Sequence, residues 1–148
     1  MGQRDFKRPE SVLVLVHTRA GEVLLLERCH PAGYWQSVTG SLEWGESAEV
    51  AARRELEEET GLMAGDLIDC RHSNRFPIHP AWRARYASEV SFNTEYVFRL
   101  EYKERPDVRV HCAEHVRSLW LPRREAAERV ASETNREAIL RFGPENSG

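Results

Sequence analysis

The chain has 148 residues, of which 41% are hydrophobic and 30% charged, and its formal net charge is −3. This length and composition predict one globular domain over residues 1–148, large enough for a hydrophobic core, and they argue against a disordered chain. The slightly acidic charge lacks the basic footprint of a nucleic-acid-binding protein, and no apolar run reaches the roughly 20 residues that span a bilayer.

The cysteines and the start of the chain indicate a compartment. Cys29, Cys70 and Cys112 are widely spaced and form no CxxC pair. They predict reduced thiols rather than a zinc site. Because no signal-peptide pattern opens the chain, we expect a cytoplasmic protein.

The first part of the chain predicts two paired strands followed by a short third one. The β-branched apolar run at 11–18 predicts a buried strand, and a turn leads to a partner strand at 23–27. After a loop with proline and glycine, residues 34–39 predict a short strand that ends beside Gly40.

The stretch from Gly40 to Leu62 reads GSLEWGESAEVAARRELEEETGL and predicts a loop, a helix and a second loop. Ser47 suits the N-cap of this helix, since its side chain can accept a hydrogen bond from the first turn. Gly61 suits a left-handed C-cap. We expect the acidic side chains of the helix to point at the loop that precedes it.

One face of the predicted helix gathers carboxylates. Glu55, Glu58 and Glu59 stand at i, i+3 and i+4, which places them together. Like-charge pairs at this spacing destabilise a helix by a few tenths of a kcal/mol each, so a bound cation would offset the repulsion. Carboxylate oxygens favour hard ions such as Mg²⁺ or Mn²⁺. For an isolated run of glutamates, a merely solvated helix face would be the better interpretation.

The second half of the chain predicts further strands and a helical end. Residues 67–76 form a weaker strand candidate, 76–91 an aromatic and basic loop, and 92–102 a half-exposed strand. A further strand is expected at 116–121, and a helical region at 122–142 opens with proline in its first turn. Strands on both sides of the central helix argue for an α/β fold with a mixed sheet between helices.

The defined positions of the central stretch are Gly40, Glu46, Arg54-Glu55-Leu56, Glu58-Glu59 and Gly61-Leu62. Their spacing resembles the signature of the Nudix hydrolases, with no departure at any defined position. The resemblance implies a Nudix-type α/β/α sandwich with a mixed central sheet. It also implies metal-dependent cleavage of a diphosphate bond, with Mg²⁺ or Mn²⁺ as cofactor.

Shorter strings are Phe6-Lys7-Arg8-Pro9, Trp35-Gln36-Ser37-Val38-Thr39-Gly40, Arg85-Tyr86, Asn93-Thr94-Glu95, Glu114-His115 and Asn135-Arg136. In order and spacing they resemble one bacterial branch of the family, which hydrolyses dihydroneopterin triphosphate in folate synthesis. The prolines within 76–80 depart from that branch in a segment near the substrate, and this departure bears on pterin selectivity.

The resemblance implies metal ligation by Glu55, Glu58, Glu59, Glu114 and the Gly40 carbonyl. Glu58 is expected as a direct or a water-mediated ligand, and for Glu114 the alternative is a plain surface glutamate. Arg54 would fix a carboxylate through an ion pair, unless it is an ordinary surface arginine. The general base stays open between Glu58 and Glu114, and a metal-bound hydroxide could also serve with little help from either.

Candidate substrate contacts follow from the same resemblance. Lys7 and Arg28 would contact phosphates, with solvated surface cations as the alternative. Thr39 and Ser132 would contribute hydrogen bonds. Side chains that could flank a flat ring are Trp35, Phe76, Ile78 and Trp82. Trp35 is also a good core residue for a strand of this kind.

The leading hypothesis is hydrolysis of dihydroneopterin triphosphate to the monophosphate and pyrophosphate. A (d)NTP pyrophosphatase for nucleotide-pool sanitation keeps the reaction and changes the substrate. A catalytically inactive Nudix-like binding module is disfavoured by the complete set of signature acids, and an RNA-cap hydrolase by the absence of a basic stripe. We therefore expect a small-molecule polyphosphate partner, no nucleic acid and no membrane, with monomer or homodimer left open.

Overall fold

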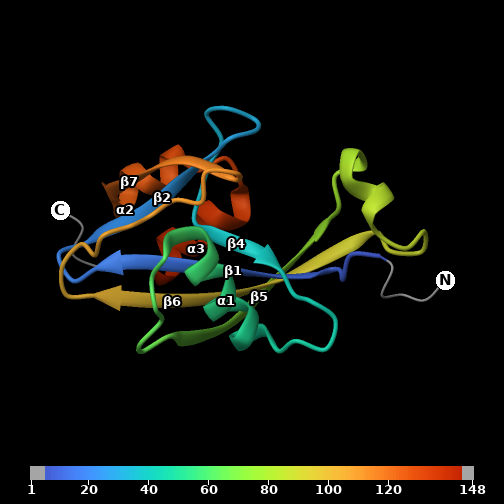
Figure 1. Cartoon of the computed structure of the whole chain (residues 1–148), viewed down its shortest axis with the longest axis horizontal. Helices are drawn as coiled ribbons and strands as arrows, with labels where there is room; N and C mark the ends of the chain where they lie inside the picture. The colour runs from blue at the N-terminus through green and yellow to red at the C-terminus, as the bar shows by residue number, and fades with distance from the viewer. Residues whose placement is uncertain (1–5, 145–148) are drawn as a thin grey trace.

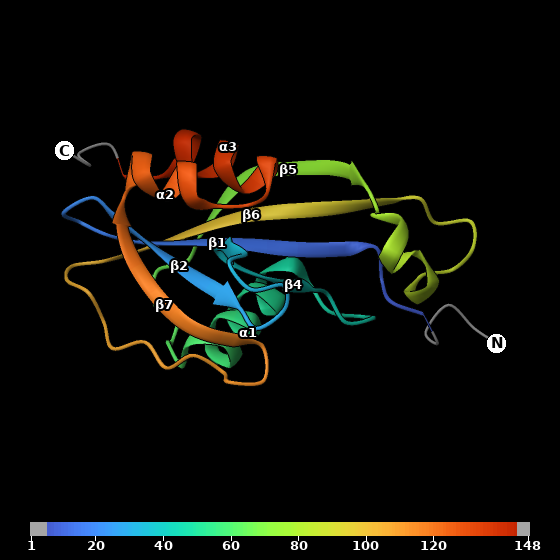
Figure 2. The ribbon, with the colours of Figure 1, turned by 90° about the horizontal axis from the view of Figure 1, so that it is seen from above.

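The structure is a computed structural model that describes residues 6–144, so both ends of the predicted 1–148 domain lie outside the described residues. Within this range the strands form one mixed sheet, seen in Figure 1. Figure 2 shows α1 (Ala48–Thr60) on one face, and α2 (Arg123–Arg129) and α3 (Glu133–Phe142) on the other. The predicted α/β/α sandwich with a mixed sheet is confirmed.

The centre of the sheet is β1 (Glu10–Thr18). It pairs in parallel with β6 (Phe92–Tyr102) along its whole length, and β5 (Ile68–Pro77) pairs antiparallel with β6 at the sheet edge. The predicted strand at 92–102 has the observed boundaries of β6. Parallel pairing requires a long connection between β1 and β6, and this connection carries α1.

Strands β1 and β2 (Glu22–Arg28) diverge from their hairpin. They pair at a single position beside the turn. Beyond it, β4 (Val38–Ser41) takes the edge of β1, while β3 (Trp35–Gln36) takes the edge of β2. The other edge of β2 is covered by β7 (His115–Pro122). The divergence therefore leaves room for β4 to bring its backbone against α1.

Both faces of β1 are covered, which explains its continuous apolar run. Val12, Val14 and Val16 pack into the core on the α1 side. Leu13 and Leu15 pack into the core beneath α2 and α3. Two cores on opposite faces thus hold the three layers together.

Helix α1 has the predicted ends. The Ser47 side chain accepts a hydrogen bond from the backbone of the first turn, and Gly61 closes the helix with φ 75° in the left-handed region. On its inner face, Ala51, Ala52 and Leu56 are fully buried. The two small alanines let the helix axis lie close to the sheet.

The predicted strand at 34–39 is wrong in one respect, because the structure has two short strands that break at Ser37. The Ser37 amide donates to Oδ1 of Asn135 at 2.8 Å, and Nδ2 of Asn135 donates to Ser37 Oγ at 2.9 Å. The Ser37 backbone therefore bonds a helix side chain instead of a neighbouring strand. This contact joins residues 98 positions apart, so no local pattern reveals it.

The predicted helical region at 122–142 is also corrected. Pro122 is the last residue of β7, so α2 begins after it. Helix α2 ends at Arg129, and the extended backbone of the next residue, Val130, forms a bridge with Trp35. Ser132 then caps a separate helix, α3. Sheet contacts interrupt a stretch whose composition alone favours one helical region.

The 76–91 segment extends beyond the sheet at the end where β1 begins (Figure 1). The structure adds a short 3₁₀ helix to the predicted loop, η2 (Pro80–Arg85). Strand β5 continues to Pro77, where an edge position tolerates a residue without an N–H.

Two further expectations concern the whole described chain. The three cysteines are free thiols, as predicted. None of the helices in residues 6–144 has the length and apolar character needed to cross a membrane.

We expect Asn135→Ala to lower the free energy of unfolding by about 1–3 kcal/mol, because it leaves buried polar groups of Ser37 without a partner. Urea unfolding followed by circular dichroism measures this change. The matched control is Glu137→Ala, an exposed position on the same helix, which should shift stability by less than about 0.5 kcal/mol. Equal stability of the two variants would contradict the role of the Asn135–Ser37 contact.

Candidate functional site

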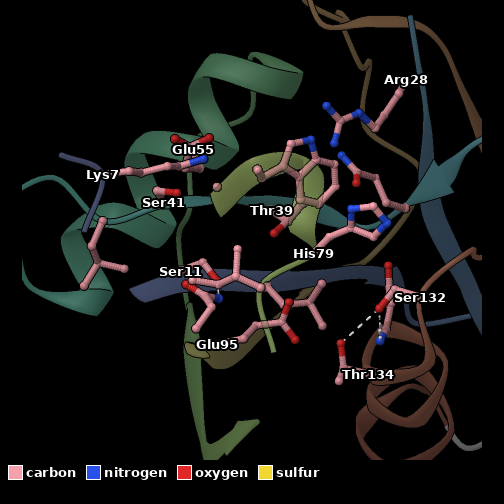
Figure 3. Close-up of a pocket in the computed structure, with 18 of the residues that line it drawn as sticks. Lys7, Ser11, Arg28, Thr39, Ser41, Glu55, His79, Glu95, Ser132 and Thr134 are labelled. Atoms are coloured by element: carbon pink, nitrogen blue, oxygen red, sulfur yellow. Dashed lines mark hydrogen bonds between the residues drawn. The ribbon is translucent and has the colours of Figure 1, made fainter. Parts of the chain in front are cut away.

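A cleft with a volume of about 1040 Å³ opens between the sheet, the 76–91 segment and the start of α3 (Figure 3). Its walls come from segments far apart in the chain, mainly residues 6–8, 28–30, 39–44, 76–79 and 132–135. Most of the residues proposed from the sequence fall within these segments. The fold therefore gathers them around one space.

At one end of the cleft, Glu55 of α1 lies directly against Gly40 of β4. A Cβ atom on Gly40 would collide with the carboxyl group of Glu55. Only glycine allows a carboxylate from the helix to approach the strand backbone this closely. The expected approach of an α1 acid to the preceding loop is thus observed at Glu55.

Arg54 ties the neighbouring acids together. Its Nε and Nη2 donate to Oε2 and Oε1 of Glu46, both at 2.8 Å, and Nη1 donates to Glu55 Oε1 at 2.7 Å. Nη2 also donates to the Ser41 carbonyl at 3.0 Å, which attaches the network to β4. The hydrogen bonds from Arg54 hold the pKa of Glu46 below its ordinary value. Arg54 therefore has the ion pair expected of it and orients Glu55.

Glu59 is the most unusual acid of the site. Its side chain is 1% exposed, and neither carboxylate oxygen has a hydrogen-bond partner among the described residues. Burial, reinforced by the Glu55 carboxylate, raises the pKa of Glu59 to about 11. Nε2 of His115 lies 3.9 Å from Glu59 Oε1, but burial lowers the pKa of this histidine. A carboxyl group in this setting requires a proton or a cation.

These residues fit a divalent metal ion. Two unpartnered oxygens of Glu59, the carboxylate of Glu55 and the adjacent backbone of Gly40 are hard oxygen donors. Across residues 6–144, no three acidic, histidine or cysteine side chains converge on one point as they stand. Arg54 binds Glu55 at present, so a metal ion would compete with this arginine for the carboxylate.

The remaining predicted acids lie on different sides of the cluster. The side chain of Glu58 is 56% exposed and stands 3.3 Å from Nη1 of Arg54, outside the cleft lining. Glu114 lines the cleft and is close enough for its charge to raise the pKa of Glu59. Its carbonyl accepts a hydrogen bond from the Cys29 amide at 2.8 Å, which joins the loops next to β2 and β7. The structure brings Glu114, but not Glu58, into the cleft.

Cationic side chains face these acids. Lys7 extends toward Glu55, and Arg28 enters from another wall (Figure 3). Burial lowers the pKa of Lys7, and the charges of Arg85 and Arg28 lower it further. The Lys7 amide donates to the Arg85 carbonyl at 2.8 Å, so the 76–91 segment holds the lysine in place. Cations beside carboxylates suit a polyphosphate bound together with metal ions.

Comparison with known proteins identifies the family. A model of the NUDIX domain matches residues 7–142. The chain belongs to the Nudix family. The match confirms the family resemblance drawn from the central stretch of the sequence.

Named relatives of this Nudix chain include two bacterial enzymes. The dihydroneopterin triphosphate diphosphatase of Escherichia coli K12 is 38% identical over 147 residues, which cover 96% of this chain and 97% of the relative. The enzyme of the same name from Haemophilus influenzae is 35% identical over 143 residues, or 93% and 89% of the two chains. The solved E. coli dihydroneopterin triphosphate pyrophosphohydrolase matches with a TM-score of 0.83 at 38% identity, covering 93% of this chain and 97% of that one.

The other predicted substrate contacts of the Nudix cleft divide into two groups. Lining residues are Thr39, Phe76, Ile78, Trp82 and Ser132. Trp35 is absent from the lining, because its ring is 7% exposed and packs in the core with α2 and α3. Its ring is therefore not available to stack on a substrate.

Several polar residues of the cleft were given no role from the sequence, although three of them stand in the shared strings: His115, Asn93 and Glu95. His115 follows Glu114, while Asn93 and Glu95 are each 6% exposed on β6. The two residues on β6 share a strand face with the buried Val97, since side chains alternate along a strand. Polar residues at inward positions of a strand were the signal that could have found them.

We expect Gly40→Ala to weaken Mn²⁺ binding roughly 10- to 100-fold, because the new methyl group displaces the Glu55 carboxylate. The flexible end of Glu55 can move, so the free energy of unfolding should change by less than about 1 kcal/mol. Isothermal titration calorimetry and urea unfolding measure the two effects. Gly65→Ala is the control, since its Cβ would meet nothing within 4 Å. Unchanged Mn²⁺ affinity in Gly40→Ala would remove Glu55 from the metal site.

In the presence of a metal chelator, Glu59→Gln should raise the free energy of unfolding by about 1 kcal/mol or more, because the amide cannot ionise and needs no proton in order to be buried. The ordinary pKa is 4.5 and the folded value about 11. Between these pH values the folded protein keeps a proton that the unfolded chain releases, so wild-type stability falls as pH rises. The advantage of the variant should therefore grow between about pH 6 and about pH 8.

Urea unfolding at both pH values measures this advantage of Glu59→Gln. Glu57→Gln, an exposed position on α1, is the control and should behave as wild type. A pH-independent difference between Glu59→Gln and wild type would contradict the burial of this acid.

Proposed function

We propose that this chain hydrolyses 7,8-dihydroneopterin triphosphate to dihydroneopterin monophosphate and pyrophosphate, a reaction of folate synthesis. The observation that carries the proposal is the near full-length similarity to the E. coli dihydroneopterin triphosphate diphosphatase, at 38% identity over 96% of this chain. Glu59 lies outside the cleft lining, but its unpartnered carboxyl group interacts with Glu55 and Glu114, which line the cleft, and this cluster supports the metal-dependent chemistry.

In this proposal the cofactor is Mg²⁺ or Mn²⁺, with Glu55, Glu59 and the Gly40 carbonyl as ligands and Glu58 as an outer contact. Such an ion neutralises phosphate oxygens and lowers the pKa of water. Arg54 positions Glu55 through the 2.7 Å hydrogen bond. The chain itself contributes the shape and the charge balance of the site.

Proton transfer is assigned to Glu114. This residue lines the cleft, whereas the Glu58 side chain is 56% exposed and lies outside it. A general base must reach the proton that it accepts, so the lining position favours Glu114 over Glu58. In the alternative assignment Glu114 ligates a metal ion, as its charge near Glu59 permits, and Glu58 is the base.

The substrate would lie along the cleft from the acids to α3. Lys7 and Arg28 would bind phosphate oxygens, because both carry cations into the lining. Thr39 and Ser132 would donate hydrogen bonds. The ring would lie against apolar side chains of the 76–91 segment, namely Phe76, Ile78 and Trp82.

The proposal treats residues 1–148 as one catalytic domain that acts on a small molecule, without nucleic acid or membrane, as a monomer or homodimer. A cytoplasmic location is consistent with the three free cysteines. A binding module without catalysis is disfavoured, since Glu55, Glu58 and Glu59 are all present.

The test is a substrate panel with Mg²⁺ that contains dihydroneopterin triphosphate, dATP and 8-oxo-dGTP. We expect kcat/KM for dihydroneopterin triphosphate to exceed the values for dATP and 8-oxo-dGTP by about 10-fold or more, with pyrophosphate as the product. The reason is that the cleft can hydrogen-bond the ring as well as stack on it. Chromatography of the products together with a pyrophosphate assay measures both. Preference for either nucleotide would instead support nucleotide-pool sanitation.

A background control for the panel is Glu59→Gln, which should lose about 100-fold or more in kcat. Glu57→Gln should keep the wild-type rate, since this residue is exposed and away from the cleft. Full activity of Glu59→Gln would contradict the proposed metal site.

A further inference from the structure

The cleft contains a second buried acid, Glu95 of β6, away from the α1 cluster. Its side chain is 6% exposed, lines the cleft and points toward Thr134 at the start of α3 (Figure 3). A carboxylate there would repel phosphate groups, so the hydrolytic chemistry does not explain it. It suits a part of the ligand that has no negative charge and carries hydrogen-bond donors.

The carboxyl group of Glu95 has two neutral hydrogen-bond partners among the described residues, Thr134 and Asn74. Nδ2 of Asn74 donates to Oε1 at 3.5 Å, at the limit of a hydrogen bond. No lysine, arginine or histidine in residues 6–144 forms an ion pair with it. Burial raises the pKa of Glu95, which the side chains of Thr134 and Asn74 counter by hydrogen bonding. Two carboxylate oxygens offer about four acceptor sites, so acceptor capacity remains on the cleft side.

The buried and half-buried groups named around Glu95 are neutral and polar, and the one charged neighbour in the α3 part of the lining, Glu133, has a side chain that is 93% exposed. Asn93 lies two residues earlier on the same strand face, and its Nδ2 donates to Ser11 Oγ at 2.8 Å. Ser11 accepts this bond and keeps its own hydroxyl proton as a donor. The hydroxyl groups of Ser132 and Thr134 lie 3.0 Å apart at the α3 end. This end of the cleft can therefore hydrogen-bond an uncharged heterocycle.

The strand register sets the distance between the two ends. Glu95 stands opposite Ser11 of β1, and Ser11 stands opposite Ser41 of β4, next to Gly40. Two strand spacings amount to about 10 Å. A flat bicyclic ring with a short carbon chain spans such a distance, with its phosphates at the α1 end. Glu95 is then placed at the far edge of the ring.

We propose that Glu95 determines ring specificity by accepting two hydrogen bonds from a 2-amino-4-oxopyrimidine edge, in which a ring N–H lies beside an amino group. This inference rests on the proposed function and names the part of the substrate that the residue recognises. Pterins and guanine share this edge. Adenine offers an amino group beside a ring nitrogen lone pair, which would face a carboxylate oxygen. A buried acceptor left unpaired in this way disfavours the wrong ring.

Glu95→Gln tests the inference, because it keeps the shape and replaces one acceptor by a donor. We expect kcat/KM for dihydroneopterin triphosphate and for GTP to fall roughly 10- to 100-fold, mainly through KM, while that for ATP stays constant or rises. Glu101→Gln is the control on the same strand, with a side chain that is 47% exposed, and should leave all three values unchanged. An equal loss for all three substrates, or no loss, would overturn the inference.

A binding measurement separates this inference from the proposed function. Fluorescence titration with 7,8-dihydroneopterin, which lacks phosphates, should show roughly 10-fold weaker binding to Glu95→Gln than to wild type. If the wild-type enzyme does not prefer the pterin triphosphate in the substrate panel, the proposed function is wrong. The role of Glu95 is then decided by the titration with 7,8-dihydroneopterin alone. Equal binding by both proteins overturns that role even if hydrolysis is confirmed. Glu95→Asp, which keeps the charge but shortens the arm, carries the same test if the glutamine variant is unstable.

Discussion

The close approach of α1 to β4 at Gly40 is the contact on which the site depends. Gly40 has no side chain, and Ala51 and Ala52 are fully buried, so helix and sheet lie near each other. On this side of the sheet the carboxyl group of Glu59 is 1% exposed, and the Glu55 side chain keeps 12% of its surface exposed at the cleft. Removing a charge from water is costly unless another charge or a hydrogen bond compensates for it. The packing of the fold therefore buries a carboxyl group that a bound cation would stabilise, and the proposed chemistry uses such a cation.

The opposite wall of the cleft depends on a different contact. Asn135 bonds both the amide and the hydroxyl of Ser37, which fixes the start of α3 beside the break between β3 and β4. The cleft thereby acquires two unlike ends, with acids and cations near α1 and neutral polar groups near α3. A ligand with a charged tail and an uncharged ring matches this division. Glu95 belongs to the α3 end, where its hydrogen-bond partners among the described residues, Thr134 and Asn74, are neutral.

Local patterns predicted the elements whose causes are local. The caps Ser47 and Gly61 and the strand at 92–102 were predicted correctly, because capping, alternation and turn chemistry act over a few residues. The break at Ser37 and the end of α2 before Val130 were not, since both depend on partners distant in the sequence. The role of Trp35 was ambiguous from the sequence, because a tryptophan in a short strand can lie in the core or in a cleft. Its actual position depends on packing partners distant in the sequence.

The sequence by itself determined the family and the acidic cluster, because the signature from Gly40 to Leu62 is contiguous and its spacing follows the period of a helix. Only the tertiary structure decided which acids are buried, and it separated a buried Glu59 from an exposed Glu58 one residue before it. It also decided that Glu95 joins the cleft. Burial and the distance between charges depend on what packs against a residue, and a local pattern does not contain that information.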